Sequence, residues 1–320
     1  MIGVESSQGA EILTKSETRL FLSGRYFTAE EIKQVQETVR VFSVLSWHEL
    51  LQTICEHLDW VTPKGRNKIA SCAKALEKLE REGLLQLPNK QPCRMPSERV
   101  SIRGRTDRQK EVVGSAWEIA PVLVEPVTEK GEQGLWNEFV QRYHDLGYRR
   151  PFGPHQRYFI TGKGGLRLGC LLFGPSAWAL APRDRWIGWT KQDRAQRLNW
   201  VVANSRFILF PWVHVKNVAS LALSLAAKRI RQDWQDRYGY APVLLETFVE
   251  AARYRGTCYK AANWIRLGVT TGRGRMDRRT QYLSTPKVIY VYPLTKDFRS
   301  FLQGRCNGQA EPPVTAPVDE

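Results

Sequence analysis

A long apolar-faced helix between apolar strands dominates the second half of the sequence. The segment VASLALSLAAKRIRQDWQDRYG, residues 218–239, has the spacing of a helix with one apolar side. The run PVLLETFV at residues 242–249 is typical of a strand buried on both faces. A strand from Arg206 to Val213 precedes the helix, and a short helix at 256–265 and a strand at 287–294 follow. These segments predict an α/β domain built around a mixed sheet.

The segment before this region predicts a helix and a hairpin. LWNEFVQRYHDLGY at residues 135–148 has helical spacing and stops near Gly147. RYFITGKGGLRLGCLLFGPSAW at residues 157–178 predicts two apolar strands joined by a tight turn at Gly162-Lys163-Gly164-Gly165. We therefore expect the sheet to begin with this hairpin.

Composition divides the chain into five segments. Residues 91–130 mix Pro, Gly and basic side chains without periodicity, which predicts an exposed linker. The end of the chain is rich in Pro and predicts disorder. The predicted order is a polar segment at 1–25, a helical module at 26–90, the linker at 91–130, the α/β domain at 131–303 and a tail at 304–320.

The helical module has the element order of a winged helix. Helical patterns cover 28–42, 46–58 and 67–83, and LLQLP at 84–88 predicts a short strand. In a winged helix, the helix after the turn enters the major groove of DNA. The alternative is a three-helix bundle that docks onto the second domain. The candidate DNA contacts in this module are Lys64, Arg66, Asn67, Lys68 and Lys74.

The chain is strongly basic, and its excess charge lies in the second domain. The formal net charge is +16. Residues 121–320 hold 30 Lys and Arg against 16 Asp and Glu, a net of +14. A field of this sign attracts polyanions, of which nucleic acid is the commonest in a cell. The alternative is a basic surface that only serves solubility.

The sequence predicts a reduced, cytoplasmic protein. Its six cysteines include no C-x-x-C pair, so we expect no structural zinc and no other metal. The N-terminus lacks an apolar signal core, and no apolar run reaches about 18 residues. We therefore expect no membrane partner.

The order of strand, long helix, strand, short helix and strand resembles the second half of the acetyltransferase superfold. In that superfold, the loop before the long helix binds the pyrophosphate of a coenzyme-A-like acyl donor with its backbone N–H groups. The usual glycines of this loop are missing here. The matching residues are Val215, Lys216, Asn217, Val218, Ala219 and Ser220.

Tyr259 also matches the superfold, because an aromatic residue, Trp264, follows it five residues later. The resemblance implies that the Tyr259 phenol acts as a general acid towards a departing thiolate. The alternative is a tyrosine that only packs beside Trp264. The cofactor therefore stays unknown, with an acyl donor as one option.

Several phrases resemble the family of component A of the Druantia anti-phage defence system. They include NSRFILFPWVHVKNVAS and LLETFVEAARYRGTCYKAANWIRLGVTTGRGR, and the resemblance covers roughly residues 134–300. The domain of this family also occurs in proteins associated with insertion sequences. The phrase RGTCYKAANW resembles the Mom-type DNA-modification enzymes, which have an acetyltransferase-like fold. These resemblances imply DNA as a partner, together with other defence or transposition proteins.

Other polar residues are candidates for chemistry or binding. Glu246 interrupts an apolar strand and must find a cation or a cleft, because an unpaired buried carboxylate is costly. A buried pair with Arg206 is one interpretation. A base or metal ligand acting with Asp184 is the other. The candidate substrate contacts are His155, Asn204 and Asn263, and further candidate DNA contacts are Arg206, Arg273 and Arg275.

Three functions are compatible with these observations. The first is a DNA-targeting subunit that keeps the acetyltransferase shape without its cofactor. The second is a DNA-modifying transferase that uses Tyr259 and an acyl donor. A metal-dependent nuclease using Asp184 and Glu246 is a third.

The charge distribution predicts that nucleic-acid affinity falls steeply with salt, because bound Lys and Arg side chains displace counterions from phosphates. Affinity for a random-sequence duplex, measured across a salt series, should fall linearly on a log–log plot. An affinity that does not change with salt would contradict the nucleic-acid interpretation of the +14 charge.

Overall fold

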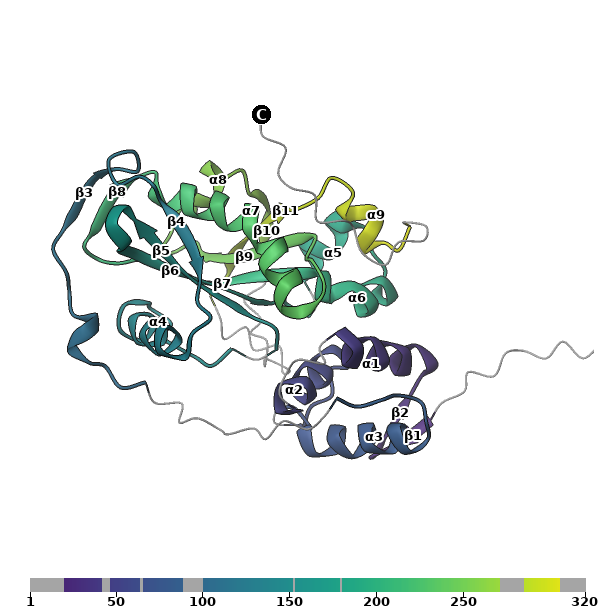
Figure 1. The fold of residues 1–320 in the computed structure, drawn as a ribbon. Helices are drawn as coiled ribbons and strands as arrows, with labels where there is room; N and C mark the ends of the chain where they lie inside the picture. Colours follow the sequence, from purple (N-terminus) through teal and green to yellow (C-terminus); the bar gives the residue numbers. More distant parts are fainter. Residues whose placement is uncertain are drawn as a thin grey trace, which may run out of the picture.

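The computed structural model describes residues 20–41, 47–63, 66–88, 100–151, 153–178, 180–270 and 285–305. A small helical module packs beside a larger α/β domain (Figure 1). The module consists of β1 (Leu20–Leu22), β2 (Arg25–Phe27), α1 (Ala29–Val41), α2 (Trp47–His57) and α3 (Ile69–Arg81). Its three helices lie within two residues of the predicted ones, because their apolar positions form a common core that includes Val35, Leu50 and Leu76.

The predicted strand at residues 84–88 is wrong. This segment has no strand partner and runs along α1 instead. Leu84 N–H bonds to Leu79 O, and Leu87 N–H bonds to the Glu80 carboxylate. Because these bonds already satisfy the backbone, no hairpin wing forms in the described part after α3. The hairpin β1–β2 comes before α1, in a part of the chain for which only polar character was predicted.

The α/β domain contains a seven-stranded sheet in the order β10-β11-β9-β7-β6-β5-β4. Neighbouring strands are antiparallel except β7 and β9, which are parallel and lie at the centre. The strands are β4 (Leu123–Pro126), β5 (Gln156–Gly162), β6 (Leu166–Pro175), β7 (Val201–Leu209), β9 (Leu244–Glu250), β10 (Ile265–Val269) and β11 (Lys287–Pro293). This order, with one parallel pair joined through a long helix, confirms the acetyltransferase-like fold.

Helices cover both faces of the sheet (Figure 1). Phe159 packs against Phe139 of α4 (Lys130–Tyr143), whereas its neighbour Tyr158 donates a hydrogen bond to Asp233 of α7 (Val218–Tyr238). Since successive strand residues point to opposite faces, α4 and α7 lie on opposite sides. The remaining helices are α5 (Ala181–Ile187), α6 (Lys191–Arg197), α8 (Thr257–Ala261), α9 (Phe298–Leu302) and the short 3-10 helices η1 (Gly104–Thr106), η2 (Lys163–Gly165) and η3 (Leu198–Trp200).

Two predicted boundaries need correction. The predicted linker at 91–130 ends in structure, because β4 is the edge strand of the main sheet and β3 (Val112–Ser115) pairs in parallel with β8 (Val213–Lys216). The strand predicted from Arg206 to Val213 begins earlier, at Val201, because Val201 and Val202 are buried between β6 and β9. None of the described helices is long and apolar enough to cross a membrane.

The helical module docks onto the α/β domain through α2. The ring of His57 stacks on Trp178, with 6.1 Å between ring centroids, and both residues line a pocket between the two parts. Glu49 of α2 lies 3.9 Å from the Arg150 guanidinium. This is the docking that the three-helix-bundle alternative predicted. In contrast, α3 lies on the far side of the module and keeps an exposed face (Figure 1).

The buried histidine at this interface makes stability depend on pH. Burial lowers the pKa of His57 to about 4, below the value of about 6.5 expected in the unfolded chain. The unfolded state therefore binds the proton more tightly, and stability falls as the pH decreases from about 6.5 towards 4.

We expect a loss of about 2 kcal/mol from this group between pH 7 and pH 5. Denaturant unfolding of the wild type and His57→Gln measures it, and the variant should depend less on pH. An equal dependence in both proteins would contradict this assignment.

Candidate functional site

The two central strands separate in the middle of the sheet. The parallel pairing of β7 and β9 runs only from Val201 with Leu244 to Asn204 with Thr247. On the other side of β7, Asn204 pairs with Phe173 and Arg206 pairs with Leu172, so Ser205 forms a bulge. The bulge turns Arg206 to the opposite face from Asn204. An opening therefore begins at Asn204, with different side chains on its two faces.

Tyr259 lies at this opening on the α7 side. Its hydroxyl donates a hydrogen bond to Asn204 Oδ1 at 2.8 Å, and Thr247 Oγ1 lies 3.4 Å from the same hydroxyl. Its ring stacks on Tyr290, with 5.7 Å between centroids, and packs edge-on against Trp264. The structure therefore brings the candidate residues Tyr259 and Asn204 together and adds Thr247.

The environment of Tyr259 keeps its phenol protonated. The residue is buried, and burial raises its pKa. A glycine at the start of α8 makes this packing possible, because a Cβ on Gly256 would come within 2.7 Å of the Tyr290 hydroxyl. Gly256 also has a φ of 65°, which favours glycine. A protonated phenol at an opening in the sheet has the chemistry of a proton donor.

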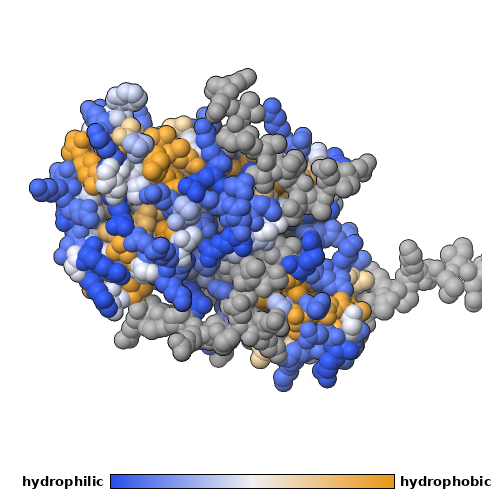
Figure 2. Space-filling view, viewed as in Figure 1, coloured by the Kyte–Doolittle hydropathy of each residue, from blue (hydrophilic) through white to orange (hydrophobic). Residues whose placement is uncertain are grey.

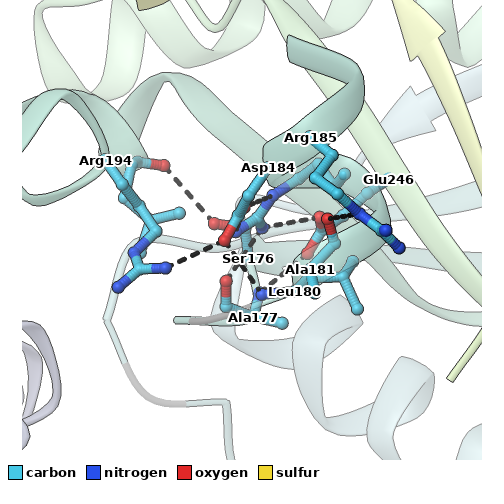
Figure 3. Close-up of polar contacts among 10 residues, drawn as sticks. Ser176, Ala177, Leu180, Ala181, Asp184, Arg185, Arg194 and Glu246 are labelled. Carbon is cyan, nitrogen blue, oxygen red and sulfur yellow. Dashed lines mark hydrogen bonds and ion pairs between the residues drawn. The ribbon is translucent and has the colours of Figure 1, made fainter. Parts of the chain in front are cut away.

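Glu246 points to the other face and forms an ion pair with Arg183 (Figure 3). Its Oε2 lies 2.8 Å from Arg183 Nη1, and its Oε1 accepts from the Ala177 N–H. Arg183 also binds Asp184, which in turn binds Arg194. Glu246 and Arg183 are fully buried. The expected buried pair exists, but its partner is Arg183 and not Arg206, whose guanidinium bonds to Gly147 O and Ser205 O instead.

This network does not resemble a metal centre. The Arg183 guanidinium bonds to both carboxylates, through Nη1 to Glu246 and through Nε and Nη2 to Asp184. Within the described ranges, no group of three or more His, Cys, Asp or Glu side chains has the arrangement to hold a metal ion. The geometry therefore supports a structural role for these two acids.

A cluster of arginines lies on the α4 side of the opening. Arg206 donates to Gly147 O in the segment after α4. Burial and the nearby Arg149 both lower the pKa of Arg206. Arg157 is buried and bonds to Asn137, His155 and Tyr148 but to no carboxylate in the described part of the chain. We call Arg149, Arg150, Arg157 and Arg206 the arginine cluster.

The cluster also fixes the state of two histidines. Burial, together with Arg157, Arg237 and Arg150, lowers the pKa of His155 to about 3. Its Nε2 lies 2.9 Å from Arg157 Nη1 and its Nδ1 lies 2.9 Å from Gly153 O, so both ring nitrogens are engaged. Burial and Arg206 likewise lower the pKa of His144 to about 4. Both imidazoles are therefore neutral, and the positive charge is concentrated on the arginines.

The predicted cofactor loop is mostly not a loop. Val215 and Lys216 belong to β8 and pair with Gly114 and Ser115 of β3. Only Asn217, with a φ of 65°, separates β8 from α7. The first turn of α7 carries no acid and no side-chain cap, so the helix start keeps the capacity to attract an anion. Within the described residues, no hydrogen bond joins Asn217, Ala219 or Ser220 to Tyr259, which bonds to Asn204 instead.

The remaining predicted residues lie apart from the opening. Arg66 and Lys74 are exposed on the helical module, and Asn67 and Lys68 are half-buried beside them. Asn263 is an exposed turn residue with a φ of 61° directly after α8. Lys64, Arg273 and Arg275 lie outside the described residues.

Sequence reasoning missed Arg183, Thr247 and most of the arginine cluster. Arg183 and Glu246 are 63 residues apart in the sequence, so no local sequence pattern could predict their contact. Arg149 and Arg150 stand together in GYRRPFG, and this paired charge was the signal available for them. Arg157 was not predicted as a site residue, because the sequence of a buried strand does not show whether a carboxylate will pair with its arginine in the folded protein.

Comparison with known proteins gives one matching family and several solved structures. Residues 78–285 match the family model described as Druantia protein DruA. A mutant of the spermidine N-acetyltransferase SpeG from Vibrio cholerae matches with 9% identity and a TM-score of 0.36, covering 55% of this chain and 96% of that chain. FeeM, an N-acyl amino acid synthase from uncultured soil microbes, matches with 12% identity and a TM-score of 0.33, covering 55% and 91%. No curated protein matches the chain.

The buried ion pair predicts a large effect on stability. Arg183→Met removes the guanidinium and leaves the Glu246 carboxylate buried with one backbone donor, so we expect a loss of roughly 3–5 kcal/mol in urea unfolding. Arg185→Met, on the exposed side of the same helix, is the control and should change stability little. A loss for Arg183→Met no larger than the control would show that the pair does not hold β9 in place.

Proposed function

The chain belongs to the Druantia protein DruA family, and from this we propose that it is a DNA-binding component of an anti-phage defence system. The family match covers residues 78–285, which include the whole region of the sheet opening. In this proposal the α/β domain binds DNA with its arginine cluster. It then acts on the DNA or directs a partner protein to it.

The observation that carries the proposal is the lack of acids around the arginine cluster. Arg157 and Arg206 are held by neutral acceptors, and Arg149 has no ion pair among the residues that the structure describes. Arg150 has only the 3.9 Å contact with Glu49. Arginines that lie close together without carboxylates attract an anion from outside the protein. A phosphate suits them because each guanidinium can donate two parallel hydrogen bonds to its oxygens. A DNA backbone supplies such anions in a row.

The helical module offers a second contact. Its docked side faces the α/β domain, but Arg66, Lys74, Lys78 and Arg81 are exposed around α3. Lys78 has a weak ion pair with Glu82 at 3.8 Å. We propose that α3 contacts DNA next to the α/β domain, as the winged-helix interpretation expected, without the strand that would complete a wing.

Two double variants separate these contacts. Arg149→Ala with Arg206→Ala should weaken duplex binding and lower the salt slope by about 2, because roughly one phosphate contact is lost per residue. Arg66→Ala with Lys74→Ala tests α3 in the same way. Arg108→Ala with Arg185→Ala, two exposed arginines away from both regions, is the matched control. Affinity should be measured by fluorescence anisotropy across a salt series. Equal affinities in all variants and the wild type would contradict DNA binding by these surfaces.

A second candidate function is an acyl-type transfer to DNA, and the position of Tyr259 favours it. The Tyr259 hydroxyl lies at the sheet opening and is kept protonated by burial. A coenzyme-A-like donor would supply the acyl group and a thiolate. The start of α7 is the group in this chain that can attract its phosphates, although strand β8 takes the place of the usual glycine loop.

Tyr259→Phe tests this second candidate. The variant keeps the ring, so its fold and DNA affinity should not change, while protection of cells against phage by the complete defence system should be lost. Tyr290→Phe, in the ring stacked on Tyr259, is the control and should keep protection. Full protection by Tyr259→Phe would exclude the phenol as the acid and leave the DNA-targeting role.

A further inference from the structure

A patch of exposed apolar side chains lies on the α/β domain, near the start of α7. Trp117 is 87% exposed and Val113 is 71% exposed, while Leu123 is 48% and Leu221 is 36% exposed. Figure 2 shows hydrophobic side chains gathered over the region of β3, β8 and β4, at the upper left. A contiguous patch of exposed apolar side chains on a folded domain is a feature of interaction sites.

The turn that carries Trp117 is firmly anchored. Ser115 N–H bonds to the Glu118 carboxylate, and Ala120 N–H bonds to Trp117 O. Two further backbone bonds tie the turn to the domain, from Ala116 N–H to Lys216 O and from Lys163 N–H to Ile119 O. The indole is therefore presented on a fixed support, which lowers the entropy lost when a partner binds.

The charges around this turn are positive. Lys163 and Lys216 are exposed, and each is bonded through its backbone to the Trp117 turn. Neither lysine has an ion pair in the described part of the chain. The one acid in the turn, Glu118, accepts a hydrogen bond from the Ser115 N–H and keeps its negative charge, which the two lysines outnumber. Directly after Lys216, α7 begins without a side-chain cap, which adds to the attraction for anions.

We propose that this Trp117 platform binds an unpaired base of single-stranded DNA by stacking, with Lys163 and Lys216 at the flanking phosphates. The proposal rests on the proposed DNA-binding function and specifies that this surface binds single-stranded DNA. Every base has a π-face, so stacking on an exposed indole tolerates any sequence. In a duplex the same faces are covered by neighbouring bases, and the platform therefore selects single strands. An apolar patch for a protein partner would not require the two free lysines.

The experiment compares single-stranded and duplex DNA of equal length on the full chain. A labelled 12-nucleotide mixed-sequence strand and its duplex serve as probes in fluorescence anisotropy. Trp117→Ala should weaken single-strand binding by about 5- to 100-fold, since stacking on an aromatic side chain contributes about 1–3 kcal/mol per base. Duplex affinity should stay unchanged. Trp117→Phe should retain most of the single-strand affinity.

Tyr26→Ala is the matched control, because Tyr26 is 63% exposed on the helical module. It should leave both affinities unchanged. A Trp117→Ala variant with normal single-strand affinity would overturn the proposal, and so would one that loses single-strand and duplex binding equally. If the wild type bound neither probe, the proposed DNA-binding function itself would fail, so the two failures are distinguishable. Thermal unfolding checks that the variants are folded.

Discussion

The pairing between β7 and β9 stops after Asn204 and Thr247, and the functional geometry of the domain depends on that point. Parallel strands need a long crossover, which α7 supplies, and the place where they separate exposes both faces of the sheet at once. On one face, Asn204 and Thr247 receive Tyr259. On the other face, Glu246 binds Arg183 and fixes β9 against the segment that leads into α5. Side chains on both faces of the sheet therefore stabilise the strands that border the opening.

The acidic side chains of the domain mostly serve its internal structure. Glu246 is fully buried against Arg183. Glu138 is also fully buried and binds Arg105, Thr106 and the backbone of Arg103, which fastens the segment before β3 to α4. Acids used in this way cannot neutralise the surface. Among the described residues, Arg149 and Arg206 have no ion pair and Arg150 has only the 3.9 Å contact with Glu49, so part of the +14 charge of residues 121–320 is concentrated after α4 and on β7.

Strong apolar patterns made much of the fold predictable from sequence. The helix α7, the strands β9 and β11, and the hairpin turn at 162–165 were found because each has an uninterrupted apolar signal or a cluster of glycines. In contrast, β10 was missed, because Ile265, Arg266 and Val269 are exposed and the segment lacks a buried face. β3, β4 and β8 are only four residues long and owe their conformation to distant partners. Within the site, the resemblance pointed to Tyr259, whereas its bond to Asn204 and the Arg183 partner of Glu246 depend on tertiary packing.

Hydrogen exchange of the full chain with and without saturating DNA tests the central claim, which is that DNA lies against the arginine cluster. The account predicts slower exchange in residues 144–151, which carry Arg149 and Arg150, and around Arg206 on β7. Protection confined to α3, with none in these α/β segments, would contradict it.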